Sequence, residues 1–486
     1  MTSSYDAVVV GGGHNGLVAA CYLGRAGKRV LVLERLDHVG GAAVSARAFP
    51  GVDARLSRYS YLVGLMPSRI VDELGLLVRL ARRRYSSYTP DPSTGGRTGL
   101  LVASGDGFAA DFYQRCANVT RALWPTMLEP LLRRSDARRL VGDDAAWSSM
   151  VEEPIGRAIT SAVPDDLARG VIATDALIGT FARLDDESLR QNVCLLYHVF
   201  NDWDVPIGGM GAVTSALTQA AARYGVEIVC SAAVFAVSGA GEVRYRLDDV
   251  ERVAHGQFVL AGVTPTVLAS LLGSAAPASA PGCQVKVNLM LERLPRLRDE
   301  SVAVEQAFGG TFHVNETYSQ LEAAYGQAAA GIVPDPLPCE IYCHSLTDPS
   351  ILSPTLRATG AQTLTVFGLH TPHGVGNRDQ LTSAVFDSLD SVLAEPIQSV
   401  IMPECVETKT TADLDAALGM TAGNIFHGGL EWPFADDDDA LDTPGRRWGV
   451  ATQHERVLLC GAGSRRGGGV SGVGGHNAAM AVLEYS

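Results

Sequence analysis

The chain has 486 residues, 47% of them hydrophobic, with 52 glycines and a formal net charge of −14. This length exceeds one ordinary core and predicts two or three domains. The negative charge argues against nucleic acid as a partner and gives no general attraction to an anionic membrane. Scattered cysteines, no apolar leader before Tyr5 and no apolar stretch long enough to span a bilayer predict a cytoplasmic protein with free thiols.

The N-terminal residues predict a strand, a glycine turn, a helix and a second strand. The apolar run 5–10 precedes the sequence Gly-Gly-Gly-His-Asn-Gly at 11–16, and an apolar stretch continues to Ala26. A second apolar run, 30–33, ends at Glu34. This order of elements, with an acid after the second strand, is typical of a dinucleotide-binding unit.

Each glycine of the turn has a physical role in such a unit. Gly11 permits the sharp turn, Gly13 lets the backbone approach a pyrophosphate, and Gly16 lets helix and strand pack closely. The helix N-terminus offers free N–H groups and a partial positive charge to the phosphates. Glu34 is expected to accept hydrogen bonds from ribose hydroxyls, which disfavours a ribose that carries a 2′-phosphate. Further cofactor contacts nearby are expected from His14, Asn15 and Arg35.

The dinucleotide is predicted to be FAD rather than NAD. Gly40, Gly41 and Ala42 follow the acid, and FAD enzymes of the glutathione-reductase and amine-oxidase type carry a glycine pair at this point. Near the other end of the chain, an expected buried strand at 457–460 is followed by a glycine-rich segment and by an apolar helix from His476. This second unit is suited to hold the flavin ring, since a helix N-terminus stabilises the negative charge of reduced flavin. Its predicted cofactor contacts, with one from the middle of the chain, are Val234, Gly461, Ala462, Gly472, Val473, Gly475 and His476.

Two interleaved domains are expected. Residues 1–75, 206–265 and 447–486 form the predicted FAD-binding domain, and residues 76–205 and 266–446 form the substrate domain. The predicted fold class is α/β: a FAD-binding Rossmann domain like that of glutathione reductase and the amine oxidases, with an interleaved α+β substrate domain.

The substrate domain is expected to combine helices with a sheet over the flavin. Apolar patterns predict helices over 112–132 and 165–182, and strands over 284–290 and 362–368. A basic cluster is also expected on a helix, where it forms either a membrane-facing patch or a solvated face. Its members are Arg79, Arg82, Arg83 and Arg84.

Further motifs accompany these units. They are residues 40–45 with Pro50–Gly51, Gly208-Gly209-Met210-Gly211, Gly423-Asn424-Ile425-Phe426-His427, and the closing run from Gly467 to Ala479. With the opening unit, they make the chain similar to the phytoene dehydrogenase-related flavoproteins, nearest the branch of the pyridine nucleotide-disulphide oxidoreductase domain-containing proteins. The resemblance spans nearly the whole chain and implies FAD-dependent redox chemistry. Arg465–Arg466 and His476 stand where relatives usually have other residues, which leaves the substrate open.

Absent motifs narrow the class. No second complete Gly-x-Gly-x-x-Gly follows a strand in the middle of the chain, so no separate NAD(P)H-binding domain is expected. No redox cysteine pair accompanies the first unit, where Cys21 stands alone. Cys339 and Cys343 have no histidine at ligand spacing, so no metal site is predicted.

The predicted function is that of an FAD-dependent dehydrogenase or desaturase with non-covalently bound FAD. A hydride passes from a C–H bond of a small to medium, partly apolar substrate to flavin N5, a proton leaves the neighbouring atom, and a C=C or C=N bond forms. Dioxygen or a quinone is the assumed electron acceptor. The alternatives are a flavin-dependent double-bond isomerase or saturase, and a non-catalytic flavin-binding interaction protein. The sequence predicts no oligomeric state.

His427 is the candidate catalytic residue. An imidazole takes or delivers a proton near neutral pH, and this one lies in a Gly-Asn-Ile-Phe-His-Gly turn before the C-terminal unit. The alternative is that His427 orders the turn through hydrogen bonds to its backbone. The candidate residues of the substrate pocket are Tyr59, Tyr61, His198, His313 and Arg466. Structural hydrogen bonding is the alternative for both of these histidines, and contact with FAD phosphate or plain surface charge is the alternative for the arginine.

Overall fold

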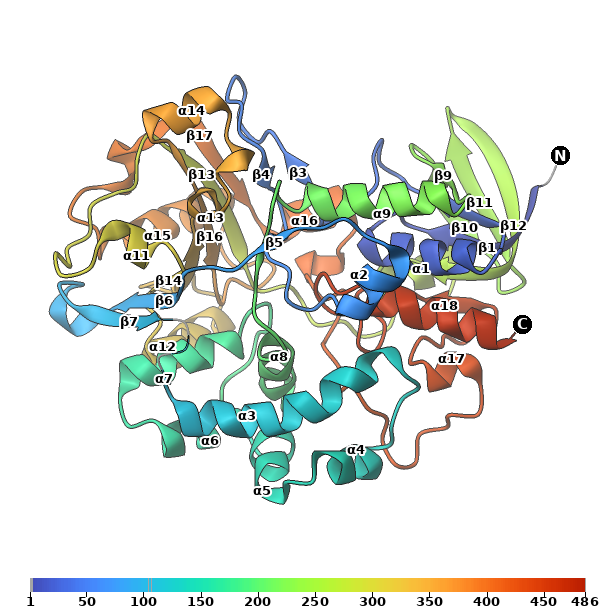
Figure 1. Ribbon diagram of the computed structural model, residues 1–486, viewed down its shortest axis with the longest axis horizontal. Coiled ribbons are helices and arrows are strands. Elements are labelled where there is room, and N and C mark those ends of the chain that lie inside the picture. The colour runs from blue at the N-terminus through green and yellow to red at the C-terminus, as the bar shows by residue number, and fades with distance from the viewer. Residues whose placement is uncertain (1–2, 104, 106, 486) are drawn as a thin grey trace.

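The computed structural model describes residues 3–103, 105 and 107–485 of the chain. Two seven-stranded sheets lie at opposite ends of the molecule, and a group of helices lies below them in Figure 1. Both termini lie beside the first sheet (Figure 1). The chain passes from one sheet to the other and back, so each sheet is built from segments that are far apart in the sequence.

The first sheet joins the N-terminal, central and C-terminal parts of the chain. Its strands are β1 (Ser3–Val10), β2 (Val30–Leu33), β9 (Glu227–Val229), β10 (Ala233–Val237), β11 (Glu242–Leu247), β12 (Val250–Ala261) and β18 (Val457–Leu459). Strands β18, β12, β1, β2 and β9 are parallel neighbours in that order, and β10–β11–β12 is an antiparallel meander. Strand β2 and the C-terminal ends of β1 and β12 are apolar and buried, as strands covered on both faces are.

Three helices lie side by side over this sheet: α1 (His14–Arg25), α9 (Gly211–Arg223) and α18 (Val473–Tyr485). Helix α1 is in the middle and contacts both others. A Cβ atom at Gly16 would collide with the carbonyl oxygen of Gly11 and would lie 3.2 Å from Val9 Cγ1. Only glycine therefore allows α1 to approach β1 this closely, as the sequence predicts.

The second sheet has the strand order β17-β13-β16-β15-β14-β6-β7. The bounds are β6 (Tyr85–Pro90), β7 (Gly99–Ala103), β13 (Val285–Leu291), β14 (Thr311–Val314), β15 (Cys339–Tyr342), β16 (Gln362–Gly368) and β17 (Ile401–Lys409). One face carries apolar side chains that pack in a separate core with α11 (Val304–Ala307) and α15 (Arg378–Asp390). The opposite face is polar and faces the rest of the molecule, which makes it a candidate wall of a site.

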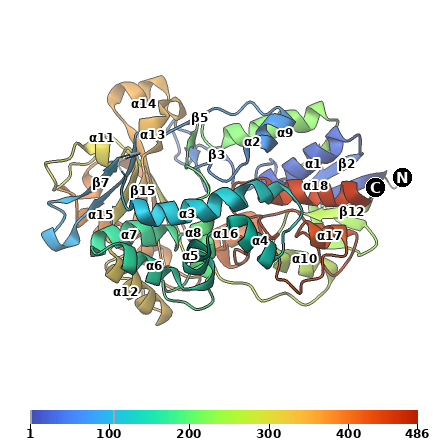
Figure 2. The ribbon, with the colours of Figure 1, turned by 60° about the horizontal axis from the view of Figure 1, so that its bottom comes forward.

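A group of helices closes the space between the sheets from one side, and Figure 2 brings it forward. It contains α3 (Ala110–Leu123), α4 (Arg134–Val141), α5 (Asp144–Trp147), α6 (Ile155–Ala162), α7 (Asp166–Asp175) and α8 (Arg190–His198), and α12 (Tyr318–Ala329) packs against α7. The remaining helices and short strands are α2 (Ser68–Leu74), α10 (Pro265–Leu272), α13 (His344–Thr347), α14 (Pro354–Thr359), α16 (Thr411–Leu418), α17 (Pro444–Arg447), β3 (Ser45–Ala46), β4 (Leu56–Ser57), β5 (Leu80–Ala81) and β8 (Val205–Pro206).

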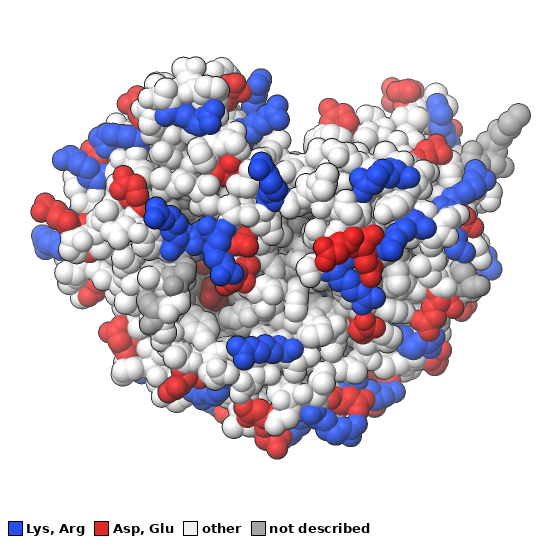
Figure 3. Space-filling model, viewed as in Figure 1, with Lys and Arg blue, Asp and Glu red and all other residues white. Residues whose placement is uncertain are grey.

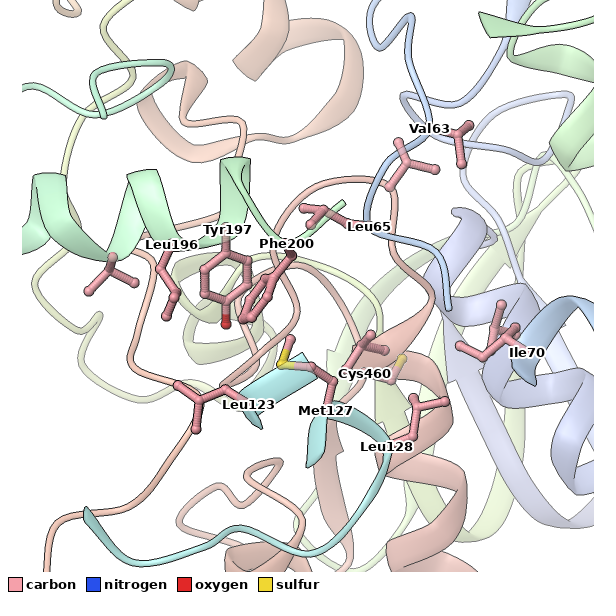
Figure 4. Close-up of a cluster of buried hydrophobic side chains, with 14 of the residues drawn as sticks. Val63, Leu65, Ile70, Leu123, Met127, Leu128, Leu196, Tyr197, Phe200 and Cys460 are labelled. Carbon is pink, nitrogen blue, oxygen red and sulfur yellow. The ribbon is translucent and has the colours of Figure 1, made fainter. Parts of the chain in front are cut away.

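An apolar core joins this helical group to the first sheet. Figure 4 shows Leu123, Met127 and Phe200 from the helical part and Val63 and Cys460 from segments next to the first sheet, with Cys460 near Met127. All are buried and belong to one continuous cluster. The helices and the first sheet are therefore held together by hydrophobic burial, at about 25 cal/mol for each Å² of apolar surface removed from water.

The architecture confirms the predicted fold class, a Rossmann-type unit with an interleaved α+β region. The strands of the first sheet lie within residues 1–75, 206–265 and 447–486, and those of the second lie within 76–205 and 266–446. The domain boundaries themselves stay a prediction.

Several predicted elements have other bounds. The helix expected over 112–132 ends at Leu123 because Pro125, which lacks an N–H, opens a 3-10 turn. The helix expected from His476 already begins at Val473. The helix expected for the basic cluster is wrong: residues 79–84 contain only the two-residue strand β5 and lead into β6.

The surface carries charges of both signs. On the face drawn in Figure 3, lysine and arginine are interspersed with aspartate and glutamate, and a notch separates two lobes at the top. Within the described residues, no helix is both long and apolar enough to cross a bilayer.

Candidate active site

A cavity of about 450 Å³ lies between the two sheets. One end is formed by the glycine turn before α1 and by the ends of β2 and β10, and the other by the polar face of the second sheet and by α7 and α8. A cavity of this size, lined by apolar walls and a few polar groups, is the usual form of a small-molecule site.

The glycine turn at one end of the cavity has an open position. Gly13 has extended backbone angles (φ −66°, ψ 168°), and a Cβ built there meets no atom of the described residues within 4 Å. The missing side chain thus leaves space on the cavity side, directly before the N-terminus of α1. This is the geometry that the sequence predicts for close approach of a phosphate to the backbone.

Glu34 lies at the same end and is buried. Its Oε2 accepts a hydrogen bond from the N–H of Gly12 (2.7 Å), and its Oε1 accepts one from the N–H of Leu36 (2.8 Å). Each carboxylate oxygen keeps a further lone pair. Glu34 is thus held in place and can still accept hydrogen bonds from a ribose diol.

The N-terminal turn and the C-terminal glycine segment meet beside the cavity. His14 Nε2 lies 3.1 Å from the carbonyl oxygen of Gly469, and Gly461 and Ala462 line the same space. Burial lowers the pKa of His14 to about 4, so its imidazole is neutral at pH 7. The two glycine units, far apart in sequence, therefore form one wall.

Most of the predicted cofactor residues line this cavity. Those that do are Gly11, Gly13, His14, Asn15, Gly16, Glu34, Arg35, Gly41, Ala42, Val234, Gly461 and Ala462. Those that lie away from it are Gly40, Gly472, Val473, Gly475 and His476.

The residues that lie away from the cavity have packing environments of their own. The Gly40 N–H donates a hydrogen bond to the carbonyl oxygen of Gly12 (2.8 Å), and this bond helps to hold the glycine turn before α1 in place. A Cβ at Gly475 would collide with the carbonyl oxygen of Asn15, so this glycine lets α18 cross α1 closely. The His476 ring packs edge-on against Tyr22, with centroids 4.9 Å apart, inside that helix pair. Because α18 begins at Val473 and not at His476, the His476 side chain lies in the interface between α1 and α18.

His427 lies beside the C-terminal segment and lines the cavity. Its Cβ is 3.2 Å from the position of a Cβ on Gly463, and its backbone has a φ of +62°, which is rare for a residue other than glycine. Its Nδ1 is buried and has no hydrogen-bond partner among the described residues. Burial, with a smaller effect of His14, lowers the pKa of His427 to about 4. The ring is therefore a neutral base, and Nδ1 does not order the turn by a hydrogen bond.

A row of side chains crosses the polar face of the second sheet. The pairing places His313 opposite Glu340, Glu340 opposite Phe367, Phe367 opposite Lys286, and Lys286 opposite Lys409. Residues paired across neighbouring strands point to the same face. All of them except His313 line the cavity.

Lys286 stands near the middle of this row and is 5% exposed. Its Nζ donates hydrogen bonds to the carbonyl oxygens of Tyr59 (2.6 Å) and Ser57 (3.0 Å), and it lies 4.7 Å from the centroid of the Tyr61 ring. Burial lowers the pKa of Lys286 to about 7, against a smaller opposing effect of Glu407. This ammonium group can therefore lose its proton near physiological pH.

Acidic groups gather at the end of the cavity farthest from the glycine turn. Burial raises the pKa of Asp175 to about 8 and that of Glu340 to about 7. The Tyr342 hydroxyl donates a 2.5 Å hydrogen bond to Glu340 Oε2. Arg83 lines the cavity here too and donates to Thr311 Oγ1 (2.7 Å). Carboxyl groups that titrate near pH 7 in a cleft are candidates for acid–base or binding roles.

The predicted pocket residues divide into two groups. Tyr59, Tyr61 and His198 line the cavity, and the His198 ring lies 5.0 Å from that of Trp203. His313 is buried behind the wall, beside Glu316.

Arg466 is not in the pocket. It is 1% exposed, and its guanidinium donates to the carbonyl oxygens of Thr126 (2.9 Å), Glu129 (2.7 Å) and Trp448 (3.0 Å). It therefore ties the C-terminal glycine segment to the helical group. Its neighbour Arg465 pairs with Glu431 near the surface.

Sequence reasoning missed Lys286, Glu340, Asp175 and the inward course of Arg83. For Lys286 and Glu340, which lie on strands, the alternation of polar and apolar residues is the feature of the sequence that could have revealed them. It is visible in Val-Lys-Val-Asn-Leu over 285–289 and in Cys-Glu-Ile-Tyr over 339–342. Such alternation marks a strand with one polar face, although it does not show what that face meets.

Comparisons with known proteins agree with this architecture. Residues 9–65 match the family described as NAD(P)-binding Rossmann-like domain. The chain is 62% identical to the Mycobacterium tuberculosis protein Rv0897c, over 99% of this chain and 97% of that protein, so it belongs to the same family. It is 27% identical to the rat pyridine nucleotide-disulfide oxidoreductase domain-containing protein 2, over 99% and 93% of the two chains. A putrescine oxidase structure covers 100% of both chains with a TM-score of 0.60 at 16% identity, which shows a shared fold.

Proposed function

We propose that this protein is an FAD-dependent dehydrogenase of the phytoene dehydrogenase-like type. It binds FAD non-covalently and oxidises a C–C or C–N bond of a small to medium, partly apolar molecule to C=C or C=N. One observation carries the proposal: a single cavity runs from the glycine turn before α1 to the polar face of the second sheet. A phosphate cradle at one end and titratable side chains at the other suit a redox enzyme, in which cofactor and substrate must meet.

The residues present fit FAD. The open side of Gly13 and the N-terminus of α1 suit the pyrophosphate, and Glu34 suits the adenosine ribose. Gly461 and Ala462, joined to the first turn through the contact of His14 with Gly469, add a second glycine segment to the wall of the same cavity. The matching family is described as NAD(P)-binding, so the choice of FAD over NAD(P) rests on this second glycine segment and is part of the proposal.

The chain's own residues supply positioning and proton transfer. FAD, when bound, supplies a two-electron acceptor. His427, neutral at pH 7 with a free Nδ1, accepts the proton that the substrate loses. Lys286 and Tyr61 set the polarity of the opposite wall, and apolar side chains such as Ile425 exclude water from the cavity.

The proposal also covers the electron acceptor, the substrate class and the cellular compartment. Dioxygen or a quinone reoxidises the flavin, and the substrate is a small molecule rather than a nucleic acid. The nine cysteines are free thiols, as is usual for proteins of the reducing cytoplasm, and we propose that compartment for this protein.

The cofactor proposal is tested by purifying the full chain and identifying what it releases on mild denaturation. We expect a yellow protein that releases FAD, with no nucleotide attached to the polypeptide in its mass spectrum. Anaerobic NADH or NADPH is expected to reduce the flavin slowly and without saturation at micromolar concentrations. Release of NADP instead of FAD would overturn the cofactor assignment, and rapid saturable reduction would favour the saturase alternative.

The catalytic proposal is tested with His427→Ala. We expect the variant to keep FAD and its absorbance spectrum, because His427 contributes no side-chain hydrogen bond through Nδ1 to the described residues. Flavin reduction by the substrate, once metabolite screening by flavin bleaching has found one, should slow by about 10²–10⁴-fold. His373→Ala is the matched control, since that histidine hydrogen-bonds Thr411 away from the cavity lining. Reduction of the His427→Ala enzyme at the native rate would assign His427 a structural role.

A further inference from the structure

A buried cluster of one histidine and two glutamates lies in the cavity wall of the second sheet. His313, Glu316 and Glu340 each offer one ligand atom, and these atoms all lie within 4.8 Å of one another. His313 and Glu340 are opposite each other on β14 and β15, and Glu316 follows in the turn after β14. The cluster is assembled across strands, so the spacing of residues in the sequence does not reveal it.

Two of the three residues of this cluster, Glu316 and His313, carry ligand atoms without a hydrogen-bond partner among the described residues. Glu316 is 0% exposed, and neither of its carboxylate oxygens has a hydrogen-bond partner among the residues described. His313 Nδ1 is also unpartnered and lies 3.6 Å from Glu316 Oε2. An unpartnered buried carboxylate costs several kcal/mol unless it is neutralised or coordinated. The arrangement therefore requires either a cation or a proton between the two glutamates.

We propose that His313, Glu316 and Glu340 bind one divalent first-row cation such as Mn²⁺ or Zn²⁺ in the wall of the cavity. Imidazole and carboxylate together are ligands that these ions take. Ligand atoms about 2.1 Å from one ion lie no more than about 4.2 Å apart, so binding of an ion would draw these atoms slightly closer than the 4.8 Å within which they now lie.

Charge balance favours a divalent ion. As metal ligands the two glutamates are ionised and bring two negative charges, and the imidazole of His313 binds as a neutral group. Within the described part of the chain, no lysine or arginine forms an ion pair with Glu316 or Glu340. Arg83 acts on Glu340 only at longer range and acts also on Asp175, the third acid of this region. One divalent ion therefore neutralises the two carboxylates of the cluster.

The surroundings also suit a bound ion. The Tyr342 hydroxyl donates to one oxygen of Glu340 (2.5 Å), and Thr174 Oγ1 donates to the other (3.4 Å), which orients the carboxylate. Glu340 lines the cavity, so an ion reaches the cluster from there. Three protein ligands leave coordination positions for water or for an oxygen or nitrogen atom of a substrate. The site does not depend on the proposed function, because none of its residues belongs to the flavin cradle.

The first experiment measures metal in the untagged full-length protein, purified without chelators, by inductively coupled plasma mass spectrometry. We expect about one equivalent of a first-row metal per chain, removed by a chelator and restored by added Mn²⁺ or Zn²⁺. Addition of Co²⁺ to the stripped protein should give visible absorption bands, and the melting temperature should rise as the free metal concentration is raised above the dissociation constant. Failure of all three ions to bind the stripped wild-type protein would overturn the proposal and assign a shared proton to the glutamates.

The second experiment assigns the ligands. Glu316→Gln keeps the shape of the side chain and should abolish saturable metal binding while FAD content stays unchanged. Tyr342→Phe should weaken the metal affinity by about 10–100-fold, the usual effect of losing an orienting partner. Glu322→Gln, on α12 and bonded to Leu184 and Arg183, is the matched control and should bind metal normally. Normal metal affinity in Glu316→Gln would contradict the assignment. Should this variant fail to fold, the Co²⁺ titration of the wild type decides.

Discussion

A side chain added at Gly13 should weaken cofactor binding, whereas one added at Gly16 should destabilise the fold. At Gly13 a Cβ meets no described atom within 4 Å, and the backbone is extended, so valine is compatible with the apoprotein fold. At Gly16 a Cβ would collide with the carbonyl oxygen of Gly11, so even alanine must push α1 away from β1. The pair therefore separates loss of cofactor from loss of fold.

The magnitudes follow from packing. Gly13→Val should change the free energy of unfolding of the apoprotein by no more than about 0.5 kcal/mol, as for other changes in open space. In the holoprotein, the valine occupies the space proposed for the pyrophosphate. Overpacking costs about 1–3 kcal/mol, which corresponds to about 5–150-fold weaker FAD binding. Gly16→Ala should lower the stability of the apoprotein itself by about 1–3 kcal/mol.

The assay combines urea denaturation of the flavin-free proteins with fluorescence titration of FAD. We expect the urea denaturation curve of the Gly13→Val apoprotein to overlay that of the wild type while its affinity for FAD falls. We expect the Gly16→Ala apoprotein to unfold at a lower urea concentration than the wild type. Full FAD occupancy in Gly13→Val would refute the assignment of this turn as the pyrophosphate site. Equal destabilisation of both apoproteins would show that the space beside Gly13 is not open.

Three further predictions concern buried charged groups. Arg466→Met leaves three backbone carbonyl oxygens without their donor, so the free energy of unfolding in urea should fall by about 3 kcal/mol or more, while an unchanged value would refute the anchoring role. Burial raises the pKa of Asp175 from 3.8 to about 8, so between about pH 4 and pH 8 the folded state holds a proton that the unfolded chain releases, and stability falls progressively as the pH rises through this range. Asp175→Asn should remove that pH dependence, which is measured as the melting temperature across the range. Because burial lowers the pKa of Lys286 to about 7, Lys286→Met should remove any limb near pH 7 from the pH profile of flavin reduction by the substrate, and persistence of that limb would assign it to another group.

The sequence by itself determined the glycine-turn end of the cavity, where the dinucleotide is proposed to bind. A strand, a glycine turn, a helix and an acid follow one another within one short segment, so their contacts are local and their geometry is set by steric rules for glycine. Gly13, Gly16 and Glu34 accordingly stand where the pattern predicts. The second glycine segment was also visible, and its residues nearest to β18, Gly461 and Ala462, do line the cavity.

Only the tertiary structure decided the other end. The row from His313 through Glu340 to Lys286 is made by long-range strand pairing, and alternation within one strand shows neither the register nor the partner face. For the same reason, charge and position in the sequence misplaced two residues: Arg466 is buried as an anchor for backbone carbonyls, and His476 packs between helices. A polar side chain acquires its role from what surrounds it after folding, since burial and neighbouring groups determine its charge and its partners.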